Sequence, residues 1–196
     1  MNFLGHLYFS DNNPELMYAN LFGDFVKGSD LYGYSHIVRS GIILHRNIDN
    51  YIDHHPEVVK LMHTLYPELP KVTGIAIDLF FDHLLAKNWA VYHPIPFEEF
   101  LENFYFYDPL NWDEYSIGFK IHISQMRDSH WINYYPEIYG LKKACEGVSA
   151  RLSFDNELKN ATTVFLNHEI EIQHCFELFM ADALPFFREK IELLNL

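Results

Sequence analysis

The sequence predicts an all-α protein, folded as a single multi-helix domain over residues 1–196. Apolar residues recur at helical spacing along most of the chain, and prolines stand where these periodic segments begin. No stretch alternates apolar and polar residues for long enough to indicate a β-strand. The length of 196 residues, with 49% hydrophobic and 17% aromatic side chains, fits one domain of ordinary size.

Prolines justify most of the expected helix starts, because the first turn of a helix does not use the N–H group that proline lacks. The prolines at these starts are Pro14, Pro56, Pro70, Pro96 and Pro136. The expected helices, in chain order, cover residues 14–27, 36–53, 56–65, 70–90, 97–106, 113–131, 135–149 and 154–191. The last of these is long enough that we expect it to be either broken or very long.

Composition excludes several classes of protein. A formal net charge of −13 argues against a nucleic-acid surface, which needs clustered Lys and Arg. The only cysteines, Cys145 and Cys175, form no CxxC motif and predict neither a disulfide framework nor a zinc knuckle. The amino-terminal stretch lacks the leading positive charge of a signal peptide, and no apolar run is long enough to span a membrane. We therefore expect a cytoplasmic protein without a membrane partner.

Two carboxylates interrupt the most hydrophobic segment, "GIAIDLFFDHLLAKNWA" at 74–90. Asp78 and Asp82 are four residues apart and share one helix face, and His83 follows the second of them. A helix that is apolar all round is buried, so these carboxylates must be protonated, paired with a basic group or bound to a cation.

A second polar stripe runs along residues 36–53. His45, Asp49 and Asp53 lie at i, i+4 and i+8 on one face. His45 and Asp53 are roughly 12 Å apart along the axis, so one ion cannot bind all three. His45 and Asp49 can share an ion, whereas Asp53 is a supporting residue, part of a second centre or a surface residue.

Two further residues stand alone in apolar stretches: Asp24 in "LFGDFV" and His6 in "NFLGHLYF". Mixed histidine and carboxylate ligands suit Mn²⁺, Fe²⁺ or Mg²⁺ better than structural Zn²⁺. A divalent ion of this kind supports hydrolysis of phosphate esters, although the spacing alone does not select that reaction.

These stretches together resemble the bacterial acyl carrier protein phosphodiesterases. Four motifs in the same order carry the resemblance: "MNFLGHL" at the start, "GDFVKG" at 23–28, "GIILHRNID" at 41–49 with "DHHP" at 53–56, and "IAIDLFFDHLLAKNW" at 75–89. The likeness continues more loosely through "GVSARL" at 147–152, where Ala150 stands in place of one arginine of the family's usual pair.

The resemblance implies an all-α fold, atypically related to the HD-domain metal-dependent phosphohydrolases. It implies an enzyme that removes 4′-phosphopantetheine from holo acyl carrier protein with Mn²⁺ or Mg²⁺, and hence a place in fatty acid biosynthesis. The metal ligands expected by position are Asp24, His45, Asp49, Asp78, Asp82 and His83. Asp24, Asp78 and His6 are the expected catalytic residues, and Lys27, Arg46 and Arg151 are expected to hold phosphate oxygens.

Three other functions stay open at this point. The chain could hydrolyse a nucleotide or another small phosphoester, or it could be a non-catalytic helical scaffold. A third alternative is a ferritin-like di-iron bundle, suggested by a single Glu-x-x-His at residues 171–174, although such sites use that motif twice. The aromatic segment "HWINYYPEIYG" at 130–140 either lines a groove for the pantetheine arm or packs in the core.

Overall fold

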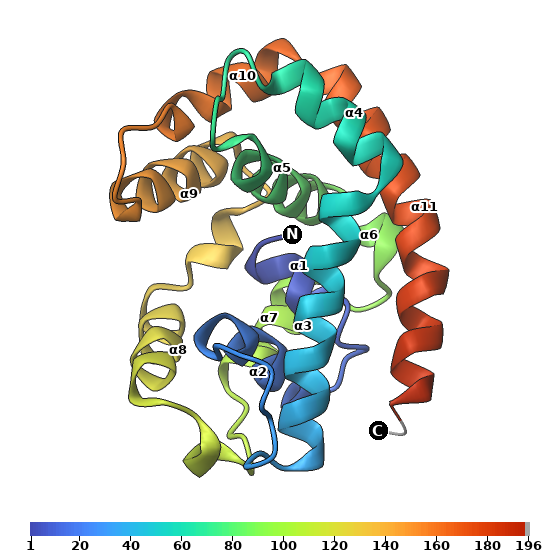
Figure 1. The fold of residues 1–196 in the computed structure, drawn as a ribbon, viewed down its shortest axis with the longest axis vertical. Helices are drawn as coiled ribbons and strands as arrows, with labels where there is room; N and C mark the ends of the chain where they lie inside the picture. The colour runs from blue at the N-terminus through green and yellow to red at the C-terminus, as the bar shows by residue number, and fades with distance from the viewer. Residues whose placement is uncertain (195–196) are drawn as a thin grey trace.

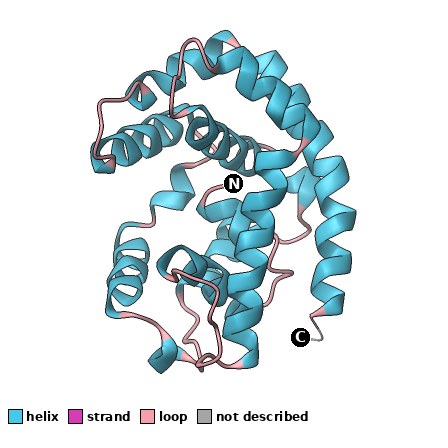
Figure 2. Ribbon diagram, in the orientation of Figure 1, coloured by secondary structure: helices cyan, strands magenta, loops and turns pink. Residues whose placement is uncertain are grey.

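The computed structural model describes residues 1–194, and within that range it contains helices and loops but no strand (Figure 2). The all-α prediction is confirmed. The α-helices are α1 (Phe3–Tyr8), α2 (Pro14–Phe22), α3 (His36–His54), α4 (Pro56–Leu65), α5 (Thr73–Lys87), α6 (Trp89–Tyr92), α7 (Phe97–Tyr105), α8 (Ile117–Ser129), α9 (Ile138–Arg151), α10 (Ala161–Asn167) and α11 (Glu169–Leu193). The 3-10 helices of the described residues join them and are η1 (Gly23–Phe25), η2 (Trp112–Glu114), η3 (Trp131–Tyr134) and η4 (Leu158–Asn160).

Most expected helices are present with modest changes of boundary. Pro14 and Pro56 begin α2 and α4, as the proline positions predicted. The last expected helix is broken, because a short loop at His168 separates α10 from α11. The sequence did not predict α1, which has only six residues and no side-chain cap at its start.

The short helix α1 lies in the interior of the molecule (Figure 1). It packs against α2 and α5, and its residues 4–7 are buried. Helix α2 in turn packs along α3, where Gly41 allows close approach because a Cβ at this position would overlap Ala19. This packing brings residues from α1, α2 and α3 to one place.

One hydrophobic cluster joins the helices of the described chain. Phe80 and Phe81 of α5 are fully buried, and Phe81 contacts Phe176 and Phe179 of α11 edge-on or tilted. Helix α11 runs along one side of the molecule, from α10 to the carboxyl end (Figure 1). Both cysteines are buried and free. No helix within residues 1–194 is long and apolar enough to cross a membrane.

Candidate metal centre and its cavity

Helix α3 presents His45 and Asp49 on one face, four residues apart. The His45 ring is buried, and its Nε2 lies 3.2 Å from an Asp49 carboxylate oxygen. The same nitrogen lies 3.3 Å from Oδ1 of Asp24, which η1 carries after α2. The i, i+4 spacing of His45 and Asp49 thus brings these two side chains next to each other, as the sequence predicted.

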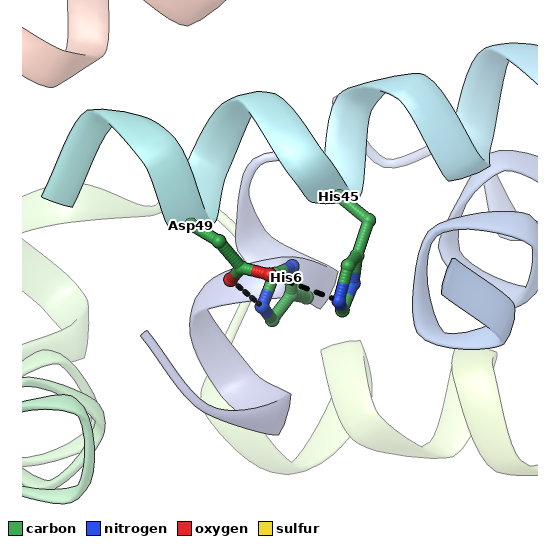
Figure 3. Close-up of side chains that lie close together, drawn as sticks. All are labelled: His6, His45 and Asp49. Carbon is green, nitrogen blue, oxygen red and sulfur yellow. Dashed lines mark ion pairs between the residues drawn. The ribbon is translucent and has the colours of Figure 1, made fainter. Parts of the chain in front are cut away.

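Helix α1 brings a second imidazole to the same point. The Nε2 atom of His6 lies 3.3 Å from Oδ1 of Asp49, and the His6 and His45 rings stack with centroids 4.1 Å apart (Figure 3). One donor atom from each of His6, His45 and Asp49 lies within 4.8 Å of the others. They are the only such group of three or more within residues 1–194.

Asn20 of α2 fixes the orientation of the His6 ring. Its side-chain NH₂ group donates to the carbonyl oxygen of His6 and to Oγ of Ser10, so its oxygen accepts from Nδ1 of His6 at 2.9 Å. Because Nδ1 then carries the proton, the lone pair of Nε2 points toward Asp49. The sequence analysis did not identify Asn20, because a buried asparagine in a helix has no spacing signature.

Gly23 fixes the position of the His45 ring from the other side. A Cβ atom at Gly23 would overlap that ring, so any larger residue would displace His45 or the backbone of η1. The glycine of the "GDFVKG" motif thus sets the distance between Asp24 and His45.

The charges of the cluster depend on each other. Burial alone lowers the pKa of His45, but hydrogen bonds with Asp24 and Asp49 outweigh it and raise that pKa to about 9. Burial and the neighbouring His45 lower the pKa of His6. Burial alone raises the pKa of Asp49, but the hydrogen bond from His45 outweighs it and holds that pKa well below its ordinary value. The two carboxylates therefore favour one positive charge in the cluster, carried by the imidazole of His45.

This arrangement fits a divalent cation. Two imidazole nitrogens and a carboxylate oxygen form a ligand set used by transition metals. Ligands about 2.1 Å from an ion and at right angles to each other are about 3 Å apart. The Oδ1 atom of Asp49 lies 3.3 Å from His6 Nε2, and its Oδ2 atom lies 3.2 Å from His45 Nε2, so each imidazole is at about this distance from one carboxylate oxygen. The Nδ1–H of His6 also has the outer hydrogen bond that usually accompanies a metal-ligating histidine.

The α5 carboxylates lie apart from this cluster. Asp82 is fully buried and accepts hydrogen bonds from the backbone N–H groups of Leu4 (2.8 Å) and Gly5 (3.0 Å). Asp78 accepts from the amino group of Met1 at 2.8 Å. The structure thus gives these two residues partners in the amino-terminal segment.

His83 also has a partner outside the cluster, since its Nδ1 lies 2.6 Å from the carbonyl oxygen of Tyr135. Of the six ligands expected by position, the structure brings together Asp24, His45 and Asp49. It adds His6, and it gives Asp78, Asp82 and His83 partners outside the cluster.

The cluster opens into a cavity of about 450 Å³, which we call the metal-side cavity. Its lining includes His6, Asp24, Asp49, Asp78 and Arg151. Asp78 therefore faces the same space as the cluster while it pairs with the Met1 amino group.

His122 of α8 also lines the metal-side cavity, and sequence reasoning missed it. Its Nε2 atom is buried and has no hydrogen-bond partner among the described residues. Nothing in the spacing of "KIHIS" distinguishes this histidine from a packing residue, so only its position in space identifies it.

The three cations expected to hold phosphate lie in different surroundings. Arg151, at the end of α9, lines the metal-side cavity. Arg46 instead donates to the carbonyl oxygens of Val26 (3.2 Å) and Gly28 (2.7 Å), which holds the loop after Asp24. Lys27 is exposed on that loop and lines no cavity that contains the cluster.

Two further residues of the sequence analysis lie outside the centre. Asp53 is exposed on α3, beyond the reach of the His6, His45 and Asp49 group. Glu171, of the single Glu-x-x-His motif, pairs with His168 at 3.0 Å and joins no ligand group within residues 1–194. The di-iron alternative has no support in this geometry.

Comparison with known proteins found one matching family model and several similar proteins that carry the same name. The family model described as acyl carrier protein phosphodiesterase matches residues 1–183. A protein of that name from Enterobacter sp. (strain 638) is 37% identical over 102 residues, which is 52% of this chain and 53% of the relative. The corresponding protein of Pectobacterium atrosepticum is 34% identical over 103 residues, or 52% of this chain and 53% of the relative.

A third protein of that name, from Photorhabdus laumondii, is 37% identical over 89 residues, which is 45% of each chain. The chain thus spans about half the length of the curated relatives it matches. No solved structure matches this chain significantly.

Proposed function

Because this chain belongs to the acyl carrier protein phosphodiesterase family, we propose that it hydrolyses the phosphodiester that joins 4′-phosphopantetheine to the serine of holo acyl carrier protein. The observation that supports this most is the His6, His45 and Asp49 cluster beside a cavity that Arg151 also lines. A cation site and a guanidinium group at one cavity suit a phosphodiester substrate.

We assign the cation to Mn²⁺ rather than Mg²⁺. Mg²⁺ prefers oxygen ligands and keeps several waters, whereas imidazole nitrogen suits transition metals. His6 Nε2, His45 Nε2 and a carboxylate oxygen of Asp49 would hold the ion, with Asp24 beside them. When bound, such an ion makes a water molecule more acidic and offsets the charge of the phosphodiester.

Asp24 is the proposed proton acceptor. Its carboxylate is exposed at the cavity, and its pKa is lowered by the hydrogen bond from His45, despite partial burial. The attacking water gives a proton to Asp24 while its oxygen forms the new bond to phosphorus. The bond from phosphorus to the serine oxygen then breaks, and the same proton goes to that oxygen. Asp78, which lines the same cavity, is the second candidate for this role.

Arg151 and the α5 carboxylates complete the proposed site in different ways. Arg151 pairs with a non-bridging phosphate oxygen and stabilises the charge that develops there. Asp82 acts through α1, because it holds the backbone of the two residues that precede His6. We regard Asp82 as a positioning residue rather than a ligand, and Arg46 as a residue that holds the Asp24 loop.

We also propose that the reaction takes place in the cytoplasm. Both cysteines of the chain are free and buried, which suits a reducing compartment.

The test is incubation of the purified protein with holo acyl carrier protein and Mn²⁺, with mass spectrometry of both products. We expect apo carrier protein and 4′-phosphopantetheine to appear together, to cease with a chelator and to return when Mn²⁺ is restored. Nucleotides and 4-nitrophenyl phosphate esters are tested in parallel. Cleavage of nucleotides but not of holo carrier protein would contradict the proposed substrate, and cleavage unaffected by chelation would contradict the metal assignment.

A further inference from the structure

A second hollow lies beside the metal-side cavity. It measures about 570 Å³, within the range of small-molecule sites, and we call it the aromatic groove. The end of α8, the helix η3, the face of α9 and the amino-terminal residues form its walls. Its main apolar lining residues are Phe3, Trp131, Tyr134, Tyr139, Ala144 and Val148.

The aromatic groove adjoins the metal-side cavity. Four residues line both: Asn2, Phe3, Val148 and Arg151. Arg151 has no carboxylate partner within residues 1–194, so its guanidinium is available to an anion where the two hollows meet. A molecule with its phosphate at Arg151 can therefore extend along the groove.

The groove offers mostly rings together with a few polar groups. Asn2, Ser129 and the tyrosines can hydrogen-bond, while Trp131 and Val148 offer apolar contact. Lys143 also lines the groove, but Glu146 pairs with it at 3.0 Å. Such a lining suits an uncharged chain that carries both amide groups and methyl groups.

We infer that the aromatic groove holds the pantetheine arm of the substrate, with the phosphate end of the arm at Arg151. This inference rests on the proposed function, which places the phosphodiester in the metal-side cavity. The arm continues from that phosphate, and the groove is the hollow that shares Arg151 with the cavity. The arm has two amides and a gem-dimethyl group, which match the lining. Both uses expected for residues 130–140 are present: Trp131, Tyr134 and Tyr135 line the groove, and Tyr135 is also largely buried in the core.

Gly147 is a position where a substitution can block the aromatic groove without disturbing the core. It lies on α9 and lines the groove, and a Cβ atom built on it meets no heavy atom within 4 Å. A larger side chain here enters open space, and replacing glycine inside a helix favours the helical backbone. Gly33 is a matched control, since its Cβ also meets nothing within 4 Å and it lines neither hollow.

The experiment is isothermal titration calorimetry of pantetheine and of 4′-phosphopantetheine with the full chain. Wild type is compared with Gly147→Phe, Gly147→Leu and Gly33→Phe, after circular dichroism confirms that each is folded. We expect both Gly147 variants to raise the Kd of both compounds at least tenfold and the Gly33 variant to change it less than twofold. The inference is overturned if wild type does not bind pantetheine, or if a folded Gly147 variant binds it as wild type does.

Hydrolysis of holo carrier protein separates this inference from the proposed function. Wild type that binds pantetheine but leaves holo carrier protein intact would contradict the function and keep the groove assignment. Wild type that cleaves holo carrier protein, with an equal kcat/KM for Gly147→Phe, would contradict the groove assignment and keep the function.

Discussion

Helices α3 and α5 each carry a polar pair at i and i+4, and the two pairs have different partners. His45 and Asp49 of α3 face the side chains of His6 and Asp24. Asp82 of α5 faces backbone N–H groups of α1, and Asp78 faces the Met1 amino group. Spacing places a pair on one helix face, but the groups opposite that face determine whether the pair binds an ion or holds the backbone.

The two pairs nevertheless serve the same centre. Asp82 holds the N–H groups of Leu4 and Gly5, and His6 is the next residue along α1. Asp82 of the α5 pair thus positions the histidine that the α3 pair contacts. Substitutions in the two helices should therefore separate loss of ion binding from loss of stability.

The largest expected effect is on activity and comes from α3. Asp49→Ala removes the carboxylate shared by both imidazoles, so we expect Mn²⁺ binding to be lost and holo carrier protein hydrolysis to fall about 1000-fold, roughly 4 kcal/mol in activation free energy. The Asp49 side chain is 46% exposed, so the melting temperature should fall less than after loss of a fully buried carboxylate. Asp53→Ala, four residues further on the exposed part of α3, is the control and should bind Mn²⁺ as wild type does. Calorimetry with Mn²⁺ and steady-state rates provide the measurements, and equal Mn²⁺ affinity in both variants would remove Asp49 from the centre.

The next effect is on stability and comes from α5. Asp82→Ala leaves two buried N–H groups without an acceptor, which costs about 1–3 kcal/mol for each, or about 2–6 kcal/mol in all. Urea unfolding measures this loss. Asp82→Asn keeps one acceptor oxygen and should lose less. If the Asp82→Ala protein is as stable as wild type but does not bind Mn²⁺, Asp82 is a metal ligand and its assignment as a positioning residue is wrong.

The last expected effect is a dependence of stability on pH. Burial raises the pKa of Asp82 to about 7, although the Met1 amino group and the N–H groups of Leu4 and Gly5 act in the opposite direction. The ordinary value is 3.8, so between about pH 4 and pH 7 the folded chain keeps a proton that the unfolded chain has released. The contribution of Asp82 to the free energy of unfolding therefore decreases as the pH rises through this interval.

Asp82→Asn has no titrating group at this position, so comparison with wild type isolates that contribution. Wild type should lose stability relative to the variant between about pH 4 and pH 7 in urea unfolding. A constant difference across this range would mean that Asp82 titrates at the same pH in the folded and unfolded chains.

The sequence predicted the fold better than the individual contacts. Proline positions and apolar stripes mark α2, α3 and α4, because these features act within one helix. The sequence did not predict helix α1, because six residues are too few to form a stable helix alone. Its structure therefore depends on tertiary packing.

The candidate centre was predictable where its geometry is local. His45 and Asp49 lie one turn apart on α3, and their spacing predicted a shared ion. The partners of Asp82 are backbone atoms of residues 77 and 78 positions away, which no helical pattern can indicate. Asn20 and His122 likewise reach the site only through the packing of α2 and α8.

The distance along the chain between Asp82 and its two partners affects how the protein folds. Contacts between residues this far apart close large loops, which is entropically costly, so they tend to form after local helices. Helices α3 and α5 can form before α1 docks, but the two imidazoles meet only afterwards. The proposed cation site is thus complete only in the finished fold, and an ion bound there would shift the folding equilibrium toward the native chain.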